Sequence, residues 1–342
     1  MSQQKSVFIT GATGFVGAKL VRHFAAKGLA VTALGRSKPP TALLNLATYV
    51  QSDIQRPVPA QTAEVVIHAA ALASDSANWT DLKQANVEGT RHVYEATRDC
   101  RCFIYISSSS VYDFRNAVHT EGESVDYQQL SPYGLSKRLA EDWLLDQDWQ
   151  GRSLFILRPR AVYGIGDRVL LPRLLRLVRR GQIFSPGDMR VSSSMTQIDN
   201  LCAAVELSES SSKLSESSKL SESSTAHIFN VSDNETYIMR EVVQRLLSEI
   251  HGKQLPFRAL PLLPLRYMAG ILESLKLAKQ FTPYSLSTVS KDCVLDLQKI
   301  IKILGYQPRH GFFNTLPEIA RWVKDIGFER VKMAEPDLPW RA

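Results

Sequence analysis

The sequence has few cysteines, four in 342 residues. A disulfide framework needs a dense, regular cysteine pattern, so this chain is not held together by one. Cys100 and Cys102 are one residue apart, and Cys202 and Cys293 stand alone, which is not the spacing of a zinc site. We therefore expect no metal centre and a reduced, cytoplasmic environment.

Long hydrophobic runs are also missing. No stretch of about 18 uncharged apolar residues occurs, so no membrane-spanning helix is expected, and the first residues lack the apolar centre of a signal peptide. Apolar residues make up 44% and charged residues 22%, which indicates a globular protein. Lys and Arg exceed Asp and Glu by 41 to 34, but the signs are interspersed. We expect a small-molecule substrate and no nucleic-acid partner.

The first half of the chain alternates β-rich runs with helical patterns. The β-rich runs fall at 5–10, 30–34, 65–68, 102–106 and 154–157, and helical patterns lie between them, notably at 18–27, 87–97 and 137–145. Continuous apolar strands that alternate with helices indicate a parallel sheet covered on both faces. The sequence therefore predicts a doubly wound α/β fold, with a dinucleotide-binding domain at 1–165 to which 195–206 and 226–232 return.

A Ser-rich block interrupts the second half at 207–225. A short unit that begins with LSESS is repeated there three times in tandem. Such a tract buries too little apolar surface to offset chain entropy, so it is predicted to be a solvated insertion after a helix at 200–207. Residues 166–194 and 233–330 lack the alternation of strand and helix patterns. They are predicted to form a smaller substrate-binding cap, followed by a tail at 331–342.

Three glycines follow the first predicted strand. Gly11, Gly14 and Gly17 would allow a tight turn, close approach of the backbone to a pyrophosphate, and close packing of the next helix. The N-terminus of that helix would face the anion. The pattern predicts a dinucleotide site, and a simple strand-to-helix turn is the alternative interpretation.

The second predicted strand ends without an acidic residue. An acid at this place would bind the ribose 2′-hydroxyl of NAD, whereas an arginine favours the 2′-phosphate of NADP. This chain has Arg36 there. NADP is therefore the preferred cofactor and NAD the alternative, unless Arg36 is an exposed cation without a role.

Tyr133 and Lys137 are four residues apart, which places both on one face of a helix. A neighbouring ammonium group stabilises a phenolate and lowers the pKa of the tyrosine. Tyr133 is therefore a candidate general acid/base near neutral pH.

A serine run at 107–110 follows a predicted strand, where ligands of open α/β sheets bind. Each signal is weak alone, but together with the glycine turn they indicate one site.

These motifs, in this order, resemble those of the extended short-chain dehydrogenase/reductase superfamily, also called the NAD-dependent epimerase/dehydratase family. They are TGATGFVG at 10–17, NVEGT at 86–90, SSSSVY at 107–112 and SPYGLSK at 131–137, and the resemblance covers about 5–330 apart from the Ser-rich block. It implies a Rossmann fold and hydride transfer, with Ser108, Tyr133 and Lys137 as catalytic residues. The cofactor contacts that it implies are Gly11, Thr13, Gly14, Phe15, Val16, Gly17, Arg36, Asp53, Ile54, Ala69, Ala70, Ala71, Asn86, Tyr133, Lys137, Pro159 and Val162.

The resemblance leaves more than one branch open. Ala161 stands where sugar-nucleotide enzymes commonly have Asn, and 191–196 lacks their Arg-Asp pair, so donors for a uracil ring and a diphosphate are missing. The stretch 196–201 instead resembles the 3β-hydroxysteroid dehydrogenase group. We therefore predict an oxidoreductase for a secondary alcohol or ketone on a bulky apolar molecule. The alternatives are a nucleotide-sugar epimerase or dehydratase, and a non-catalytic cofactor-binding sensor.

An apolar, proline-punctuated segment at 255–278 is predicted to cover an apolar pocket. Core packing and peripheral contact with an anionic membrane are the alternatives. A homodimer is one option for the assembly of the chain.

Overall fold

The computed structural model describes residues 5–74, 76–113, 115–149, 151–214, 226–274, 286 and 290–341. Its centre is a seven-stranded sheet with the strand order β13-β7-β5-β4-β1-β2-β3, in which every neighbouring pair is parallel. The strands are β1 Ser6–Thr10, β2 Ala30–Gly35, β3 Thr48–Gln51, β4 Val65–His68, β5 Cys102–Ile106, β7 Ser153–Pro159 and β13 Ala226–Val231. This order reverses direction between β1 and β4, so the prediction of a doubly wound Rossmann fold is confirmed.

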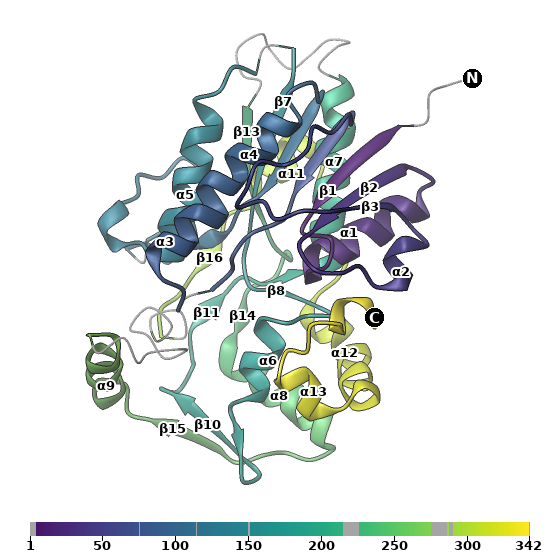
Figure 1. Cartoon of the computed structure of the whole chain (residues 1–342). Helices are drawn as coiled ribbons and strands as arrows, with labels where there is room; N and C mark the ends of the chain where they lie inside the picture. Colours follow the sequence, from purple (N-terminus) through teal and green to yellow (C-terminus); the bar gives the residue numbers. More distant parts are fainter. Residues whose placement is uncertain are drawn as a thin grey trace.

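Helices cover both faces of the sheet (Figure 1). The core on one face includes residues of α1 (Phe15–Ala26), α7 (Ile198–Leu214) and α11 (Gln298–Leu304). The other core includes residues of α4 (Gly89–Ala96) and α5 (Pro132–Leu145). The central strands β4 and β5 are buried along their whole length, which explains why their sequences are apolar at successive positions.

A second part of the chain lies below the carboxyl ends of the strands in Figure 1 and has its own apolar core. It contains α6 (Leu170–Leu175), α8 (Met239–His251), α12 (Phe312–Ile326), α13 (Phe328–Lys332) and the small sheet β15-β10-β9 (Phe257–Leu260, Gln182–Pro186 and Val178–Arg179). We call this part the cap. The strand pair of β12 (Thr196–Gln197) with β8 (Val162–Tyr163) joins the two parts, because Val162 packs against the sheet core and Tyr163 lies in the cap core. A further pair is β16 (Val294–Leu295) with β6 (Val118–His119), where Leu295 belongs to the sheet core.

The beginning of the Ser-rich block is not a solvated insertion, so the prediction is wrong for 207–214. Helix α7 continues through the first LSESSSK copy to Leu214, with Ser208 and Ser212 buried. Both hydroxyls donate to carbonyls of the preceding turn, and Glu209 forms ion pairs with Lys5 and Arg101. Small serines fit against the sheet, and basic partners from distant segments neutralise the acid. Residues 215–225 lie outside the described residues.

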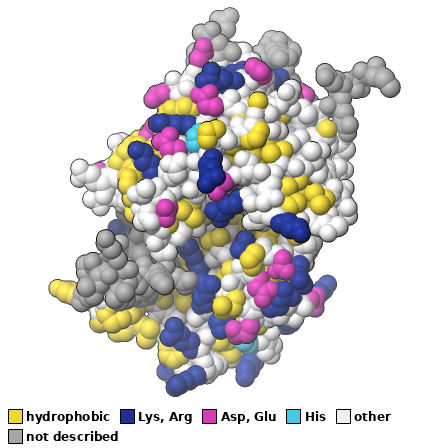
Figure 2. Space-filling view, viewed as in Figure 1, with side chains coloured by type: hydrophobic (Ala, Val, Ile, Leu, Met, Phe, Trp, Pro, Cys, Tyr) yellow, Lys and Arg dark blue, Asp and Glu magenta, His cyan; other side chains and the backbone are white. Residues whose placement is uncertain are grey.

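The segment predicted as a lid, 255–278, contains β15 and then α9 (Leu262–Ser274), which lies at the outer edge of the cap (Figure 1). Leu263 and Tyr267 are 77% and 79% exposed, Met268 is half exposed, and Ala269 is buried. Figure 2 shows the apolar atoms at this lower-left edge. This exposure argues against core packing for the described part of α9, while 275–278 lie outside the described residues.

None of the helices within the described ranges is long and apolar enough to cross a bilayer.

Candidate active site

The glycine turn connects β1 to α1 and has the geometry of an anion cradle. Gly11 has a φ of +73°, and a Cβ at Gly17 would lie 2.2 Å from the Gly11 carbonyl oxygen, so side chains are excluded at both positions. Among the described residues, no acceptor is found for the N–H groups of Thr13, Phe15 and Val16. Open N–H groups at a helix N-terminus bind phosphate, so the turn fits a dinucleotide pyrophosphate.

The loop after β2 presents Arg36 to solvent at the same edge of the sheet. Tyr49, which no sequence motif singled out, donates its hydroxyl to the Ser37 carbonyl over 2.5 Å and holds this loop. Burial raises the pKa of Tyr49 to about 12, so its hydroxyl remains a donor at neutral pH. Asp53 and Ile54 follow β3, and the Asp53 carboxylate accepts the Gln55 N–H over 3.1 Å. The loops after β2 and β3 thus place a cation and an acceptor at the carboxyl ends of neighbouring strands.

A buried hydrogen-bond chain fixes the segment after β4. The Thr90 hydroxyl donates its hydrogen to the Asn86 carbonyl (2.6 Å), so its oxygen must accept from His68 Nε2 (3.1 Å). On the other side of the ring, His68 Nδ1 accepts the Thr10 hydroxyl (2.7 Å). The Thr10 oxygen then accepts the Ala70 N–H (3.1 Å). Burial, aided by the charge of Lys137, lowers the pKa of His68 to about 3. His68 is therefore a neutral structural residue that orients 69–71.

Asn86 lies in a π-helical turn, Lys83–Glu88, directly before α4. Its side-chain oxygen accepts the Leu72 N–H (2.7 Å), and its side-chain nitrogen donates to the Ser136 hydroxyl (2.9 Å). Asn86 therefore connects the segment after β4 to helix α5. π-helical turns occur often at functional sites, because they re-aim side chains that a regular helix would place elsewhere.

Helix α5 begins tightly packed against the serine run. Ser131 caps it by accepting the Gly134 N–H (3.0 Å). A Cβ at Gly134 would lie 2.1 Å from the Ser110 carbonyl oxygen, so only glycine permits this approach. The half-buried Tyr133 and Ser108 therefore belong to two segments in direct contact at the carboxyl end of β5. Gly134 is a positioning residue that the sequence analysis quoted without assigning it a role.

Lys137 is buried, with 1% of its surface exposed. Its ammonium group donates to the Ile106 carbonyl over 2.8 Å and lies 4.0 Å from the centre of the Tyr105 ring. Burial lowers the pKa of Lys137 to about 7, and the carboxylate of Glu141, one turn further along α5, opposes this shift. The amine is therefore held at the end of β5 on the same helix as Tyr133.

Behind this site lies an ion pair that the sequence analysis missed. Arg158 and Glu141 are 1% and 0% exposed, and two guanidinium nitrogens donate to both carboxylate oxygens, with a shortest distance of 2.5 Å. Ser107 donates to the same carboxylate, and Arg158 also donates to the Tyr112 hydroxyl (2.9 Å). The available signal was a single base, Arg158, in the otherwise apolar strand β7. The pair fixes Ser107, the residue before Ser108.

The segment after β7 contains the remaining predicted contacts. Pro159 is buried at the end of β7, and Val162 is half-buried in β8, where it pairs with Thr196. Between them, Ala161 has a φ of +45°, in the left-handed region that asparagine and glycine adopt more readily. Alanine at this position offers no side-chain amide to a ligand.

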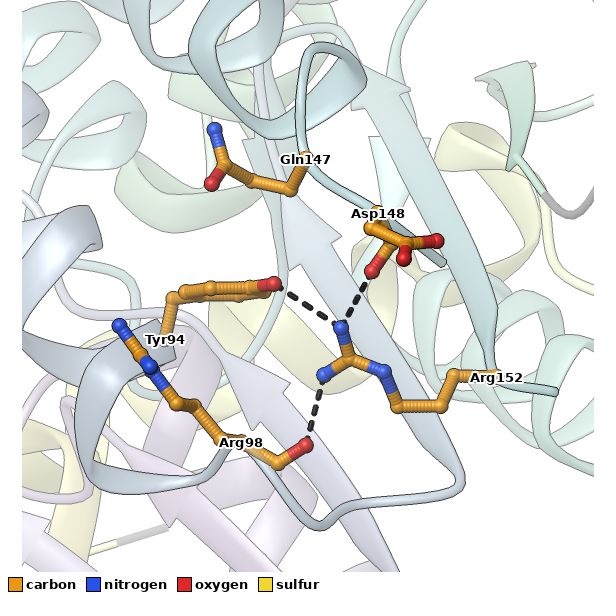
Figure 3. A pocket seen from close by; sticks show the side chains of 5 residues that line it. All are labelled: Tyr94, Arg98, Gln147, Asp148 and Arg152. Carbon is orange, nitrogen blue, oxygen red and sulfur yellow. Dashed lines mark hydrogen bonds between the residues drawn. The ribbon is translucent and has the colours of Figure 1, made fainter. Parts of the chain in front are cut away.

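A separate cavity of about 410 Å³ lies near the starts of β5 and β7 (Figure 3). It is lined by Tyr94, Arg98, Gln147, Asp148 and Arg152. The Arg152 guanidinium donates to the Arg98 carbonyl (2.7 Å), the Tyr94 hydroxyl (2.9 Å) and the Asp148 carbonyl (2.5 Å). Ligands of open α/β sheets bind at the opposite edge, so this cavity is not the candidate active site.

Comparison with known proteins agrees with this geometry. The model of the NAD dependent epimerase/dehydratase family matches residues 7–213. A 2-alkyl-3-oxoalkanoate reductase of Stenotrophomonas maltophilia is 29% identical over 71% of this chain and 75% of its own. The decarboxylating sterol-4-alpha-carboxylate 3-dehydrogenase of Saccharomyces cerevisiae is 26% identical over 95% of this chain and 99% of its own. The solved structure of MoeE5 with UDP-glucuronic acid and NAD superposes with a TM-score of 0.72, at 22% identity, over 94% of this chain and all of that one, which shows the shared fold.

The match covers more than half of the chain, and it contains the glycine turn, the serine run and the Tyr133–Lys137 helix. Named reductases and dehydrogenases are among the relatives. The protein therefore belongs to the NAD-dependent epimerase/dehydratase family and is an enzyme of the extended short-chain dehydrogenase/reductase superfamily.

Proposed function

We propose that the protein is an NADP-preferring oxidoreductase that interconverts a secondary alcohol and a ketone on a bulky, mostly apolar molecule. The observation that carries the proposal is the contact of the Tyr133–Lys137 helix with the serine run at the carboxyl end of β5. This is the edge where the glycine turn offers its open N–H groups.

The residues of this site divide the chemistry between them. When bound, the nicotinamide cofactor accepts or supplies the hydride, while the protein positions and polarises the reactants. Tyr133 removes the hydroxyl proton during oxidation and returns it during reduction. The Lys137 ammonium group stabilises the Tyr133 phenolate and binds the cofactor ribose, and the Ser108 hydroxyl holds the substrate oxygen.

The proposed substrate class depends on polar groups that are missing. Ala161 provides no amide, and two side chains of 191–196 are already engaged: the Ser193 hydroxyl accepts from Arg160 Nε (3.0 Å), and the Thr196 hydroxyl donates to the Val231 carbonyl of β13 (2.8 Å). A nucleotide sugar would need donors for its uracil ring and diphosphate. The relatives named for alkyl-oxoalkanoate and sterol chemistry support an apolar substrate that carries its oxygen on a secondary carbon.

A substrate screen of the purified full chain tests this proposal. Sterol 3β-alcohols, 2-alkyl-3-oxoalkanoates, UDP-glucose and UDP-glucuronate would each be mixed with NADP or NADPH, and the absorbance of the reduced cofactor followed. Turnover of an apolar alcohol or ketone is expected. Conversion of a UDP-sugar without net change in cofactor absorbance, detected by chromatography, would establish the epimerase alternative instead.

Cofactor choice is tested by Arg36→Ala. A guanidinium bound to a 2′-phosphate contributes roughly 1.5–3 kcal/mol, so the variant should lose about ten- to a hundredfold in NADP affinity. NAD affinity should remain nearly unchanged. Calorimetric titration of both cofactors measures the difference, and Lys38→Ala, at an exposed cation two residues away, is the matched control. Equal losses for NADP and NAD, or a parent protein that prefers NAD, would refute the assignment.

A further inference from the structure

The C-terminal end of the chain returns to the glycine turn. After α13, the short helix η4 (Leu338–Trp340) packs against α1, at the boundary between the sheet and the cap (Figure 1). The indole nitrogen of Trp340 donates to the Ala12 carbonyl over 3.2 Å. We call residues 338–341 the C-terminal strap. These residues belong to the predicted tail at 331–342, and the family match ends well before them, at residue 213.

The strap is anchored on both sides. Leu338 is completely buried in the cap core. Arg22 of α1 donates to the Pro339 carbonyl over 2.5 Å, and its guanidinium carbon lies 4.7 Å from the centre of the Trp340 ring. From the cap side, Trp322 of α12 donates to the Arg341 carbonyl over 3.4 Å. The strap therefore connects cap helix α12 to the first helix of the dinucleotide-binding part.

The contact with Ala12 controls the direction of a neighbouring donor. The peptide unit that contains the Ala12 carbonyl also contains the Thr13 N–H, and in a planar trans peptide these groups point in opposite directions. On its other side, the Ala12 N–H donates to the Leu34 carbonyl of β2 over 3.0 Å. With Ala12 held by both β2 and Trp340, the Thr13 N–H keeps a fixed direction before any anion binds.

We infer that Trp340 is a positioning residue of the cofactor site, which orients the glycine turn for the dinucleotide pyrophosphate. The inference rests on the dinucleotide-binding function proposed above. A donor that is ordered in advance does not have to be ordered by the ligand, so the strap increases cofactor affinity without touching the substrate. Trp340 acts through the Ala12–Thr13 peptide and takes no part in proton or hydride transfer.

Trp340→Phe tests the inference, because it keeps an aromatic ring beside Arg22 and removes the indole N–H together with the five-membered ring that carries it. A neutral hydrogen bond contributes enough for an affinity change of about two- to tenfold. We expect the Kd of NAD and of NADP, measured by calorimetry, to increase by this factor. The KM for cofactor should rise equally, with kcat and the KM for substrate nearly unchanged.

Trp149→Phe is the matched control. The Trp149 indole also donates to a backbone carbonyl, that of Leu144 over 2.7 Å, but it lies on the opposite face of the sheet, away from the glycine turn. This variant should bind both cofactors like the parent. If Trp340→Phe loses no more affinity than Trp149→Phe, the inference is wrong. If the parent itself binds neither cofactor, the proposed function fails first, and the inference fails with it.

A second variant covers the case in which Trp340→Phe does not fold. Arg22→Met removes the anchor of the strap at Pro339 and leaves the Trp340 indole intact. It should weaken the binding of both cofactors in the same direction, while the circular dichroism spectrum stays that of the parent. A folded Arg22→Met protein with parental cofactor affinity would overturn the positioning role of the strap.

Discussion

Replacing Tyr133 by phenylalanine should lower kcat by at least about a hundredfold, since positioned acid–base catalysis contributes on the order of 10² to 10⁴. The substitution removes the hydroxyl that exchanges the proton but keeps the ring at the start of α5. Cofactor affinity should change little, because Gly134 and Lys137 still hold the helix against the serine run and β5. Steady-state kinetics with the substrate found in the screen, together with calorimetric cofactor titration, measure both quantities.

Tyr127→Phe is the control for this prediction. Tyr127 lies just before α5, is 36% exposed, and donates its hydroxyl to Asp142 over 2.7 Å. Loss of this surface hydrogen bond should leave kcat close to that of the parent. Near-normal turnover by Tyr133→Phe would show that another group carries the proton, and the assigned mechanism would then be wrong.

The second large effect is expected from Glu141→Gln. This change removes a charge but keeps the shape of the side chain, so the buried Arg158 guanidinium would lose its ionic partner. Breaking a buried ion pair from one side costs about 3–5 kcal/mol, because the remaining charge stays desolvated. The midpoint of urea unfolding should fall accordingly. The pKa of Lys137 should also fall, since the Glu141 carboxylate is the group that raises it.

Two comparisons make the stability prediction specific. Glu329→Gln breaks the pair with Lys332 on the exposed surface of α13, and surface pairs contribute little, so the unfolding midpoint should barely move. The double variant Glu141→Leu with Arg158→Leu removes both charges and should recover part of the stability lost by Glu141→Gln. A Glu141→Gln protein as stable as the parent would show that the pair does not stabilise the folded state.

Much of the site could be predicted because its signals are local in the sequence. The glycines of the turn are three residues apart, and Tyr133 and Lys137 are four residues apart, so helix and turn geometry alone relate them. Apolar runs such as 65–68 and 102–106 coincide with β4 and β5, since strands buried on both faces need apolar residues at every position. Strand β3 was missed, because its TYVQ sequence is half-exposed at the sheet edge and carries no continuous apolar run.

The boundary of the Ser-rich block shows where composition misled the prediction. The seven residues 207–213, rich in serine and charge, predict a solvated tract, yet helix α7 continues through them to Leu214. Burial of Ser208 and Ser212 depends on space beside the sheet, and burial of Glu209 depends on Lys5 and Arg101. Neither the space nor the partners can be read from the residues of the block itself.

By itself, the sequence determined the buried strands of the Rossmann sheet, the glycine turn and the Tyr133–Lys137 helix, because each follows from periodicity or spacing within a few residues. Only the tertiary structure decided which distant groups hold these elements in place. Arg158 reaches Glu141 across 17 residues, and Trp340 reaches Ala12 across 328. Such contacts form because folding brings buried charges and open carbonyls close to the groups that pair with them. The number of residues between two groups in the sequence does not predict whether they will be in contact.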